Sequence, residues 1–256
     1  MSLWLAELFG LEGKVALVTG GARGIGRMIA EAFVAAGVAR VYVASRDPGD
    51  AADIGCIPLA ADLASEAGCR ALAADIATRE SRLDILVNNS GASWLAPLES
   101  YPETEWDRLF QLNLKAPFFL VRTLLPLLEA AGSAEHPARI INIGSVAGSI
   151  AESQSCYAYG LSKGALHQLG RMLAKELAPR HVTVNAIAPG RFATKMTKGI
   201  TDDAARYTRE AAAVPLGRWG SSDDIAGIAL LLASRAGAYI TGATVPLDGG
   251  TALHIA

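Results

Sequence analysis

Seven short apolar runs, most of them separated by segments with helical periodicity, divide this chain of 256 residues. The runs cover residues 14–19, 40–44, 57–60, 83–87, 139–143, 182–187 and 243–247. Strands that are apolar throughout and alternate with helices are typical of a parallel sheet covered by helices on both faces. The pattern therefore predicts an α/β protein. Because no repeat, low-complexity tract or linker interrupts it, we expect one domain over residues 1–256.

One connection between the predicted strands is unusually short. Only residues 47–56 separate Arg46, just after the second apolar run, from the third run. A parallel crossover normally needs a dozen or more residues, usually including a helix. We therefore expect a turn or two of helix here and a thinly covered sheet face.

Composition limits the classes of function. Hydrophobic residues make up 51% of the chain and charged residues 19%, which indicates a well-packed globular protein. The net charge of −2 argues against nucleic acid or a membrane surface as a partner. The longest apolar candidate for a membrane span, residues 116–128, is too short and is interrupted by Arg122.

Cysteine and histidine spacing point to a reducing compartment without a metal site. The three cysteines form no C-x-x-C and are odd in number. The four histidines show no metal-ligand spacing, so we expect no metal. The first ten residues lack the basic start and cleavage site of a signal peptide. We expect them to dock on the body of a cytoplasmic protein.

A glycine-rich turn, residues 20–26, follows the first predicted strand and opens a helix. Gly20 permits a tight turn, and the small residues let the backbone approach a pyrophosphate. The helix N-terminus then offers N–H groups and partial positive charge to the anion. This context predicts a dinucleotide site; the alternative is an ordinary strand-to-helix loop.

The end of the second predicted strand indicates which dinucleotide binds. An NAD site usually carries an acidic residue here, which accepts from the ribose 2′-hydroxyl. This chain has Ser45 and Arg46 instead, and Arg23 lies in the glycine-rich turn. Guanidinium groups bind a phosphate bidentately, which favours NADP(H). The alternative is that Asp47 neutralises Arg46 in a solvated loop.

Tyr159 and Lys163 stand four residues apart, so in a helix they share one face. A free phenol has a pKa of about 10, and a fixed ammonium nearby lowers it toward the range where proton transfer is effective. The pair therefore predicts an acid–base site. The alternative for such a pair alone is an amphipathic helix surface.

Two further polar residues occupy informative positions. Pro117 lies four residues after Asn113 and deprives the Asn113 carbonyl of its helical partner, which a water could replace. If Pro117 instead stands in the first turn of a later helix, Asn113 still lies at a helix break. Ser145 follows a buried strand at its carboxyl end, where ligands bind in open α/β sheets. A helix-capping role is its alternative.

The order and spacing of these motifs resemble those of the short-chain dehydrogenase/reductase family over nearly the whole chain. The motifs are Thr19-Gly20-x-x-x-Gly24-x-Gly26, Asn88-Asn89-x-Gly91, Ser145, Tyr159-x-x-x-Lys163 and Pro189-Gly190-x-x-x-Thr194. The resemblance implies a doubly wound Rossmann-type domain with a seven-stranded parallel sheet and a nicotinamide cofactor, here NADPH/NADP+. Ser90 departs from the alanine usual in the family.

The resemblance also implies the roles of individual residues. The catalytic set is Asn113, Ser145, Tyr159 and Lys163: Ser145 orients the substrate oxygen, Tyr159 transfers the proton, Lys163 holds the ribose hydroxyls, and Asn113 supports a water that reaches Lys163. The implied cofactor-binding residues are Gly20, Arg23, Gly24, Ile25, Gly26, Ser45, Arg46, Asp62, Leu63, Asn89, Gly91, Tyr159, Lys163, Pro189, Gly190 and Thr194.

The substrate is less strongly indicated. Trp94, Phe192 and Met196 flank the motifs and are expected to wall an apolar pocket, although such residues are more often core. Several segments resemble NADPH-dependent 3-oxoacyl reductases, among them one linked to rhamnolipid synthesis, which implies a carrier- or CoA-linked acyl chain. Arg180 is a candidate contact for an acidic carrier, although a solvated arginine at a helix end is the favoured interpretation. The alternatives are another alcohol or ketone, such as a sugar alcohol or steroid, and a non-catalytic dinucleotide sensor.

A lid and an oligomer complete the expectations. Residues 192–215 lie beyond a strand end and carry helix-forming residues, so we expect a mobile substrate lid. The helix from Tyr159 to Leu177 spreads apolar residues over more than one face, and Gly164 and Gly170 permit close approach to a second copy. Together with the resemblance, this surplus predicts a homotetramer.

Overall fold

A computed structural model describes residues 3–151, 155–194 and 197–253. Within these residues, seven parallel strands form one sheet in the order β3-β2-β1-β4-β5-β6-β7. The strands are β1 (Val15–Thr19), β2 (Arg40–Ser45), β3 (Ile57–Ala60), β4 (Ile85–Asn88), β5 (Ala138–Ile143), β6 (Val182–Pro189) and β7 (Thr244–Leu247). The winding direction reverses between β1 and β4, so the predicted doubly wound Rossmann-type sheet is confirmed.

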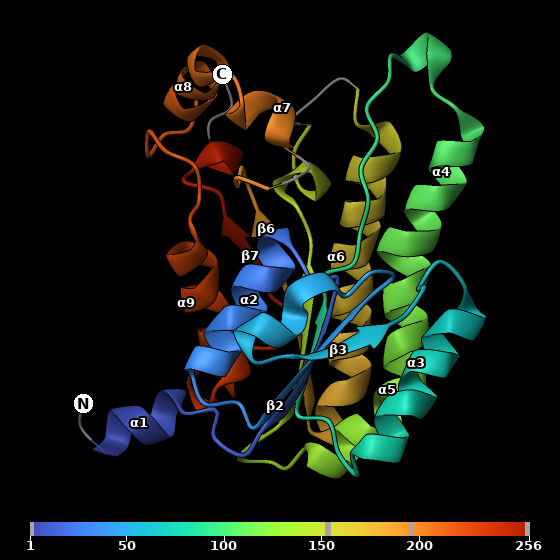
Figure 1. The fold of residues 1–256 in the computed structure, drawn as a ribbon, viewed down its shortest axis with the longest axis vertical. Helices are drawn as coiled ribbons and strands as arrows, with labels where there is room; N and C mark the ends of the chain where they lie inside the picture. The colour runs from blue at the N-terminus through green and yellow to red at the C-terminus, as the bar shows by residue number, and fades with distance from the viewer. Residues whose placement is uncertain (1–2, 152–154, 195–196, 254–256) are drawn as a thin grey trace.

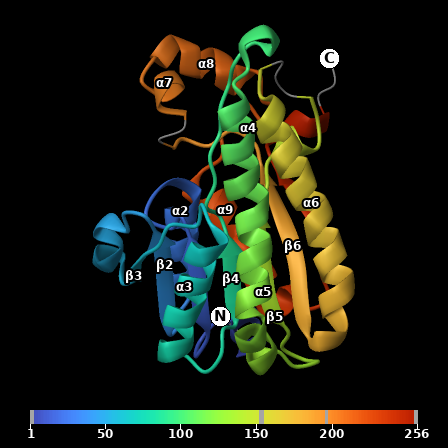
Figure 2. The same ribbon diagram turned by 90° about the vertical axis from the view of Figure 1, so that its right-hand side faces the viewer.

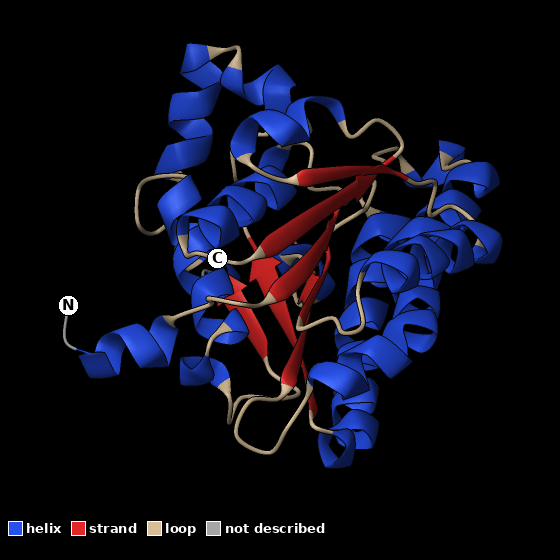
Figure 3. Ribbon diagram, turned by 60° about the horizontal axis from the view of Figure 1, so that its bottom comes forward, coloured by secondary structure: helices blue, strands red, loops and turns tan. Residues whose placement is uncertain are grey.

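Helices cover both faces of the sheet (Figures 1 and 3). One face packs against α2 (Gly24–Ala35) and α9 (Ser222–Ala233), and the other against α3 (Glu66–Arg79), α5 (Ala116–Ala131) and α6 (Tyr157–Leu177). Neighbouring residues of β1 belong to opposite cores, because side chains alternate across a strand. Burial on both faces explains why the strands are apolar throughout.

The short connection between β2 and β3 behaves as predicted. A 3₁₀ helix, η1 (Gly49–Ile54), is the only regular element between them, and Gly55 ends it in the left-handed region at φ 77°. Pro58 and Ala60 of β3 remain exposed. The edge of the sheet at β3 is therefore covered on one side by less than a full helix.

A π turn joins two helices into one long rod. It covers Gln111–Lys115, between α4 (Glu103–Phe110) and α5. Figure 2 shows α4 stacked end to end on α5. Pro117 is the second residue of α5, but the helical backbone runs without a gap from α4 through the π turn, so this proline lies inside the rod and offers no N–H to the Asn113 carbonyl, as the first interpretation predicted. Asn113 lies in the π turn that interrupts the α-helix, as both interpretations required.

The remaining segments lie at the two ends of the sheet. Helix α1 (Leu3–Phe9) contacts the turn Arg235–Gly237, although Trp4 and Phe9 stay exposed, so the N-terminal segment docks along only part of its surface. Helices α7 (Lys198–Thr201) and α8 (Ala204–Ala212) lie beyond the carboxyl ends of the strands (Figure 1). None of the helices in the described residues combines the length and apolarity that a membrane crossing requires.

Candidate active site

The motif residues gather at one edge of the sheet. They follow the carboxyl ends of six strands that are neighbours in space, from β3 through β6. Asp62 and Leu63 follow β3, Ser45 and Arg46 lie at β2, and the glycine-rich turn follows β1. Asn89 and Gly91 follow β4, Ser145 follows β5, and Pro189 to Thr194 lies at β6. Residues far apart in the sequence therefore share the edge where ligands bind in this type of sheet.

Asn89 holds the glycine-rich turn in shape. Its Nδ2 donates to the carbonyls of Thr19 (2.9 Å) and Gly20 (3.0 Å), and the Thr19 hydroxyl accepts from the backbone N–H of Asn89 and of Ser90. Gly20 has a φ of 64°, in the left-handed region. A Cβ on Gly26 would overlap Nδ2 of Asn89. The motif therefore needs a glycine where backbone and amide approach closely.

The first turn of α2 is suited to an anion. No side chain caps it at Arg23, in contrast to α3 and α9, which are capped by Ser65 and Ser221. The backbone N–H groups of an uncapped first turn need another acceptor. Ile25 lies in this turn, packed on the core below. These features fit the pyrophosphate of a dinucleotide.

The end of β2 presents cations. Arg46 and Arg23 are both exposed and follow the neighbouring strands β2 and β1. Asp47 accepts from the backbone N–H of Gly49 through Oδ1, and its own carbonyl accepts from the Ser45 hydroxyl at 2.5 Å. The Asp47 carboxylate is thus bonded within its own loop.

The adenine side of the predicted site is partly buried. Leu63 is 4% exposed and belongs to the core, whereas Asp62 is exposed and accepts from the N–H of Ala64.

The residues after β6 pack closely on their neighbours. Gly190 donates to the carbonyl of Leu247, and a Cβ on Gly190 would lie 2.8 Å from Cα of Asp248. Thr194 brings its methyl group against Gly24. The start of the predicted lid therefore contacts the glycine-rich turn.

Lys163 and Tyr159 lie on the same side of α6, as their spacing predicted. The Lys163 ammonium is 5.9 Å from the centroid of the Tyr159 ring and donates to the carbonyl of Ile143 at 2.7 Å. Lys163 is 5% exposed, and burial lowers the pKa of its ammonium to about 8. A cation fixed beside a phenol favours the phenolate, which is the electrostatic requirement for proton transfer by Tyr159.

Asn113 joins three segments through its buried side chain. Its Oδ1 accepts from the N–H of Ala92, and its Nδ2 donates to the Ala92 carbonyl and to the hydroxyl of Ser162. Ser162 in turn donates to the carbonyl of Tyr159. A Cβ on Gly91 would lie 3.1 Å from Oδ1 of Asn113 and 3.5 Å from Nζ of Lys163. The π turn therefore connects the loop after β4 with the helix that carries Tyr159.

Ser145 has the capping role that was its alternative, and it lies at the carboxyl end of β5. Its hydroxyl accepts from the N–H of Ala147 and caps the 3₁₀ turn η4 (Val146–Gly148). This turn packs directly on α6, since a Cβ on Gly148 would lie 2.6 Å from the backbone N of Gly164. The close approach brings the end of β5 against the helix that carries Tyr159 and Lys163.

The predicted substrate residues differ in their surroundings. Trp94 is 43% exposed on the loop after β4, as a pocket wall requires. Phe192 is 3% exposed and its ring packs over Gly220, so it lies in the core. Met196 lies outside the described residues. The roles of all three stay predictions.

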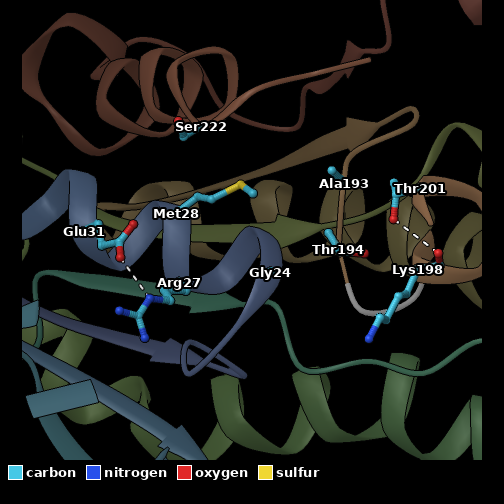
Figure 4. Close-up of a pocket in the computed structure, with 9 residues that line it drawn as sticks. All are labelled: Gly24, Arg27, Met28, Glu31, Ala193, Thr194, Lys198, Thr201 and Ser222. Carbon is cyan, nitrogen blue, oxygen red and sulfur yellow. Dashed lines mark hydrogen bonds and ion pairs between the residues drawn. The ribbon is translucent and has the colours of Figure 1, made fainter. Parts of the chain in front are cut away.

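An open groove of about 650 Å³ borders the glycine-rich turn. Figure 4 shows its walls: Gly24, Arg27 and Met28 of α2 on one side, and Thr194 and Lys198 at the start of the lid on the other. Two of its lining residues, Gly24 and Thr194, belong to the predicted cofactor site. Among the described residues, no group of three or more His, Cys, Asp and Glu could hold a metal ion.

The sequence analysis missed two buried residues of this region. Ser162 bridges Asn113 and Tyr159, and His167 lies beneath the segment that carries Ser145. A spacing of four residues from Lys163 was the available signal for His167. Nothing in the sequence marks Ser162, because its partner Asn113 is 49 residues away.

Comparisons with known proteins agree with this geometry. A family model described as "Enoyl-(Acyl carrier protein) reductase" matches residues 20–252. The chain belongs to the short-chain dehydrogenase/reductase family, whose members are oxidoreductases, and the predicted resemblance is confirmed.

One curated relative and two solved structures are similar to this chain over nearly its whole length. The "Rhamnolipids biosynthesis 3-oxoacyl-[acyl-carrier-protein] reductase" of Pseudomonas aeruginosa is 52% identical over 250 residues, covering 94% of this chain and 97% of that protein. The "Pseudomonas aeruginosa RhlG/NADP active-site complex" has a TM-score of 0.94 at 50% identity and covers 96% and 99% of the two chains. A gluconate 5-dehydrogenase from Burkholderia cenocepacia J2315, in complex with NADP and tartrate, has a TM-score of 0.88 at 32% identity and covers 98% and 100%.

Burial of Lys163 predicts a pH-dependent stability. The folded protein releases the Lys163 proton near pH 8, and an exposed lysine does so near pH 10.5. Between these values the unfolded chain binds more protons, so this group makes the protein more stable as pH rises. Lys163→Met removes the effect. Urea unfolding of both proteins should show that the difference between their free energies of unfolding changes by up to about 3 kcal/mol from pH 8 to pH 10.5. Parallel pH curves would contradict the prediction.

Proposed function

We propose that this chain is an NADP(H)-dependent reductase that converts a carbonyl group to an alcohol, with a 3-oxoacyl thioester as its substrate. The observation that carries the proposal is the buried arrangement of Lys163 beside Tyr159, with Ser145 and Asn113 at the same edge of the sheet. The similarity to the rhamnolipid-pathway reductase supports the choice of substrate.

The residues of the site fit the cofactor. The uncapped first turn of α2 would hold the pyrophosphate, and Arg23 and Arg46 would hold the 2′-phosphate. Lys163 and Asn89 would line the ribose side. The cofactor, when bound, supplies the hydride that reduces the carbonyl carbon. Solved relatives with NADP support this assignment.

The protein groups then manage the oxygen of the substrate. Ser145 donates a hydrogen bond to it and fixes its position. Tyr159 donates a proton to the same oxygen as negative charge develops on it. The Lys163 ammonium beside the ring would stabilise the phenolate that Tyr159 leaves after this transfer, and a water beside Asn113 is proposed to return the proton through Lys163.

Two alternatives remain as outcomes of an experiment. The similarity to a gluconate dehydrogenase favours a sugar alcohol as the second candidate, and a non-catalytic dinucleotide sensor is the third. Initial rates should be compared for 3-oxoacyl thioesters on CoA and on a carrier protein, for gluconate and related sugar acids, and for steroids, with NADPH and NADH. The proposal expects the highest kcat/KM with a 3-oxoacyl thioester and NADPH. Binding of NADPH without turnover of any substrate would favour the sensor.

The same assay compares CoA with a carrier protein as the group that carries the acyl chain. Arg180, the candidate contact for an acidic carrier, forms an ion pair with Glu129 of α5. Its guanidinium therefore already has an anionic partner within the subunit. The proposal of a thioester substrate does not depend on Arg180.

We propose that residues 1–256 form a single domain and that its residues 192–215 form a lid over the substrate site. The described part of this segment contains α7 and α8, and its residues Ile200, Ala211 and Val214 form a small core with Trp219, which lies just after the segment. An ion pair between Arg191 and Glu210 (2.8 Å) connects α8 to the end of β6. So small a core favours motion relative to the sheet.

A homotetramer remains our proposal for the assembly. Leu161 and Met172 of α6 are 55% and 62% exposed, and Trp106 and Phe118 lie exposed on α4 and α5. The sequence analysis was wrong about the small residues: Gly164 faces Gly148, and Gly170 faces Asn142, within the same subunit. Light scattering of the active protein should give about four times 26.6 kDa, and a mass near that of one chain would contradict the proposal.

We also propose a cytoplasmic location, which the three buried free cysteines support.

Tyr159→Phe tests the proton donor. The variant keeps the ring but loses the transferable proton, so kcat should fall by about 10²-fold or more. NADPH affinity, measured by fluorescence titration, should change less than about threefold. A variant with near wild-type turnover would exclude Tyr159 as the acid.

Arg46→Asp tests the cofactor preference. The change removes a cation and adds a like charge beside the 2′-phosphate, so affinity for NADPH should fall at least about tenfold while affinity for NADH stays nearly constant. The exposed Arg235, in the turn that contacts α1, provides a matched control as Arg235→Asp. An equal loss for both cofactors would place Arg46 elsewhere.

A further inference from the structure

His167 is a buried residue that the proposed reaction does not use. It stands one helical turn after Lys163, so Tyr159, Lys163 and His167 share one stripe of α6. It is 4% exposed, and its Nε2 has no hydrogen-bond partner in the part of the chain that the structure describes. Burial, and then the charges of Lys163 and Arg171, lower the pKa of His167 to about 4. The imidazole is therefore uncharged at neutral pH.

The imidazole ring touches both ends of the segment that carries Ser145. A Cβ added to Gly144, directly before Ser145, would overlap Nε2 of His167 and lie 2.7 Å from its Cδ2. A Cβ added to Gly148, at the end of η4, would lie 2.9 Å from Cε1. On its third side, Nδ1 lies 3.5 Å from the hydroxyl of Ser149, at the outer limit of a hydrogen bond. The ring occupies the space that two missing side chains leave.

Other interactions fix the shape of the Ser145 segment. Gly144 donates to the carbonyl of Ile187 in β6 at 2.7 Å, and Gly148 donates to the carbonyl of Ser145 at 3.0 Å. These bonds hold the turn to the sheet and to itself. The distance from the turn to α6 depends on what lies between them, which is the backbone contact of Gly148 with Gly164 and the ring of His167.

We propose that His167 is a positioning residue for Ser145, whose ring fills the space beside Gly144 and Gly148 and thereby sets the distance from the Ser145 hydroxyl to Tyr159. The proposal rests on the proposed role of Ser145 as the donor to the substrate oxygen. A displacement of about 1 Å between groups that act on one oxygen is enough to lower turnover severely. His167 acts through Ser145 and touches no reacting atom.

A pair of complementary substitutions tests the contact. Gly144→Ala introduces a methyl group where the imidazole lies, and kcat should fall at least about tenfold. His167→Ala leaves the segment unsupported and should also lower kcat. In the double variant the methyl group occupies part of the emptied space, so kcat should exceed that of Gly144→Ala. A double variant whose loss equals the product of the single losses would overturn the proposal.

The readouts separate positioning from general destabilisation. KM for the carbonyl substrate and the dissociation constant of NADPH should stay within about threefold in each variant, with the loss confined to kcat. Activity is measured well below each thermal midpoint determined by circular dichroism. His136→Ala, on an exposed histidine, is the matched control and should be unchanged. A kcat of His167→Ala equal to that of the wild type would also overturn the proposal.

A variant that does not fold, and a wild-type protein without activity, are distinguished from a failure of the positioning role. If His167→Ala does not fold, His167→Asn replaces it in both the single and the double variant, because its smaller side chain also vacates the space beside Gly144. A wild-type protein that reduces no carbonyl would contradict the proposed function. An active wild type with independent losses would contradict the positioning role alone.

Discussion

The buried ammonium of Lys163 is the interaction on which the arrangement of the site depends. Removing a lysine from water disfavours its charged form, and the carbonyl of Ile143 at 2.7 Å offsets only part of that cost. The bond links the carboxyl end of β5 to the N-terminal third of α6. It is one of the contacts that hold the strand leading to Ser145 against the helix that carries Tyr159. A site built around this cation accepts electron density on a neighbouring oxygen, which is what carbonyl reduction requires.

Backbone contacts and short amide side chains, rather than long flexible ones, hold the surrounding parts in place. Asn89 ties the loop after β4 to the glycine-rich turn, and Asn113 ties the same loop to α6 through Ala92 and Ser162. Both amides donate to backbone carbonyls, Asn89 to those of Thr19 and Gly20 at the end of β1 and Asn113 to that of Ala92 in the loop after β4. Neighbouring loops therefore share hydrogen-bond partners, and a displacement in one of them is transmitted to the next.

Local spacing made much of this predictable from sequence. The strands were visible as apolar runs, the glycine-rich turn by its position after β1, and the Tyr159–Lys163 pair by its helical interval. Features that depend on packing between distant segments were not visible. Gly164 was assigned to a subunit contact because the sequence does not show that Gly148, sixteen residues earlier, packs against it. The burial of Phe192 was not visible either, because Phe192 and Gly220 are 28 residues apart and meet only in the folded chain. Ser162 has no local signal at all.

The π turn at Gln111–Lys115 has an effect on helix phase. A π turn holds one residue more than the α-helix it interrupts, and each residue rotates an α-helix by about 100°. The side-chain faces of α4 and α5 are therefore out of step along a single rod, so no continuous stripe runs its length. A chain shortened by one residue here would regain regular helix geometry and bring the two faces into line. It would also turn either Asn113 away from Ala92 or the apolar face of α5 away from the sheet. The extra residue thus makes the helix less regular so that one buried amide can face the site.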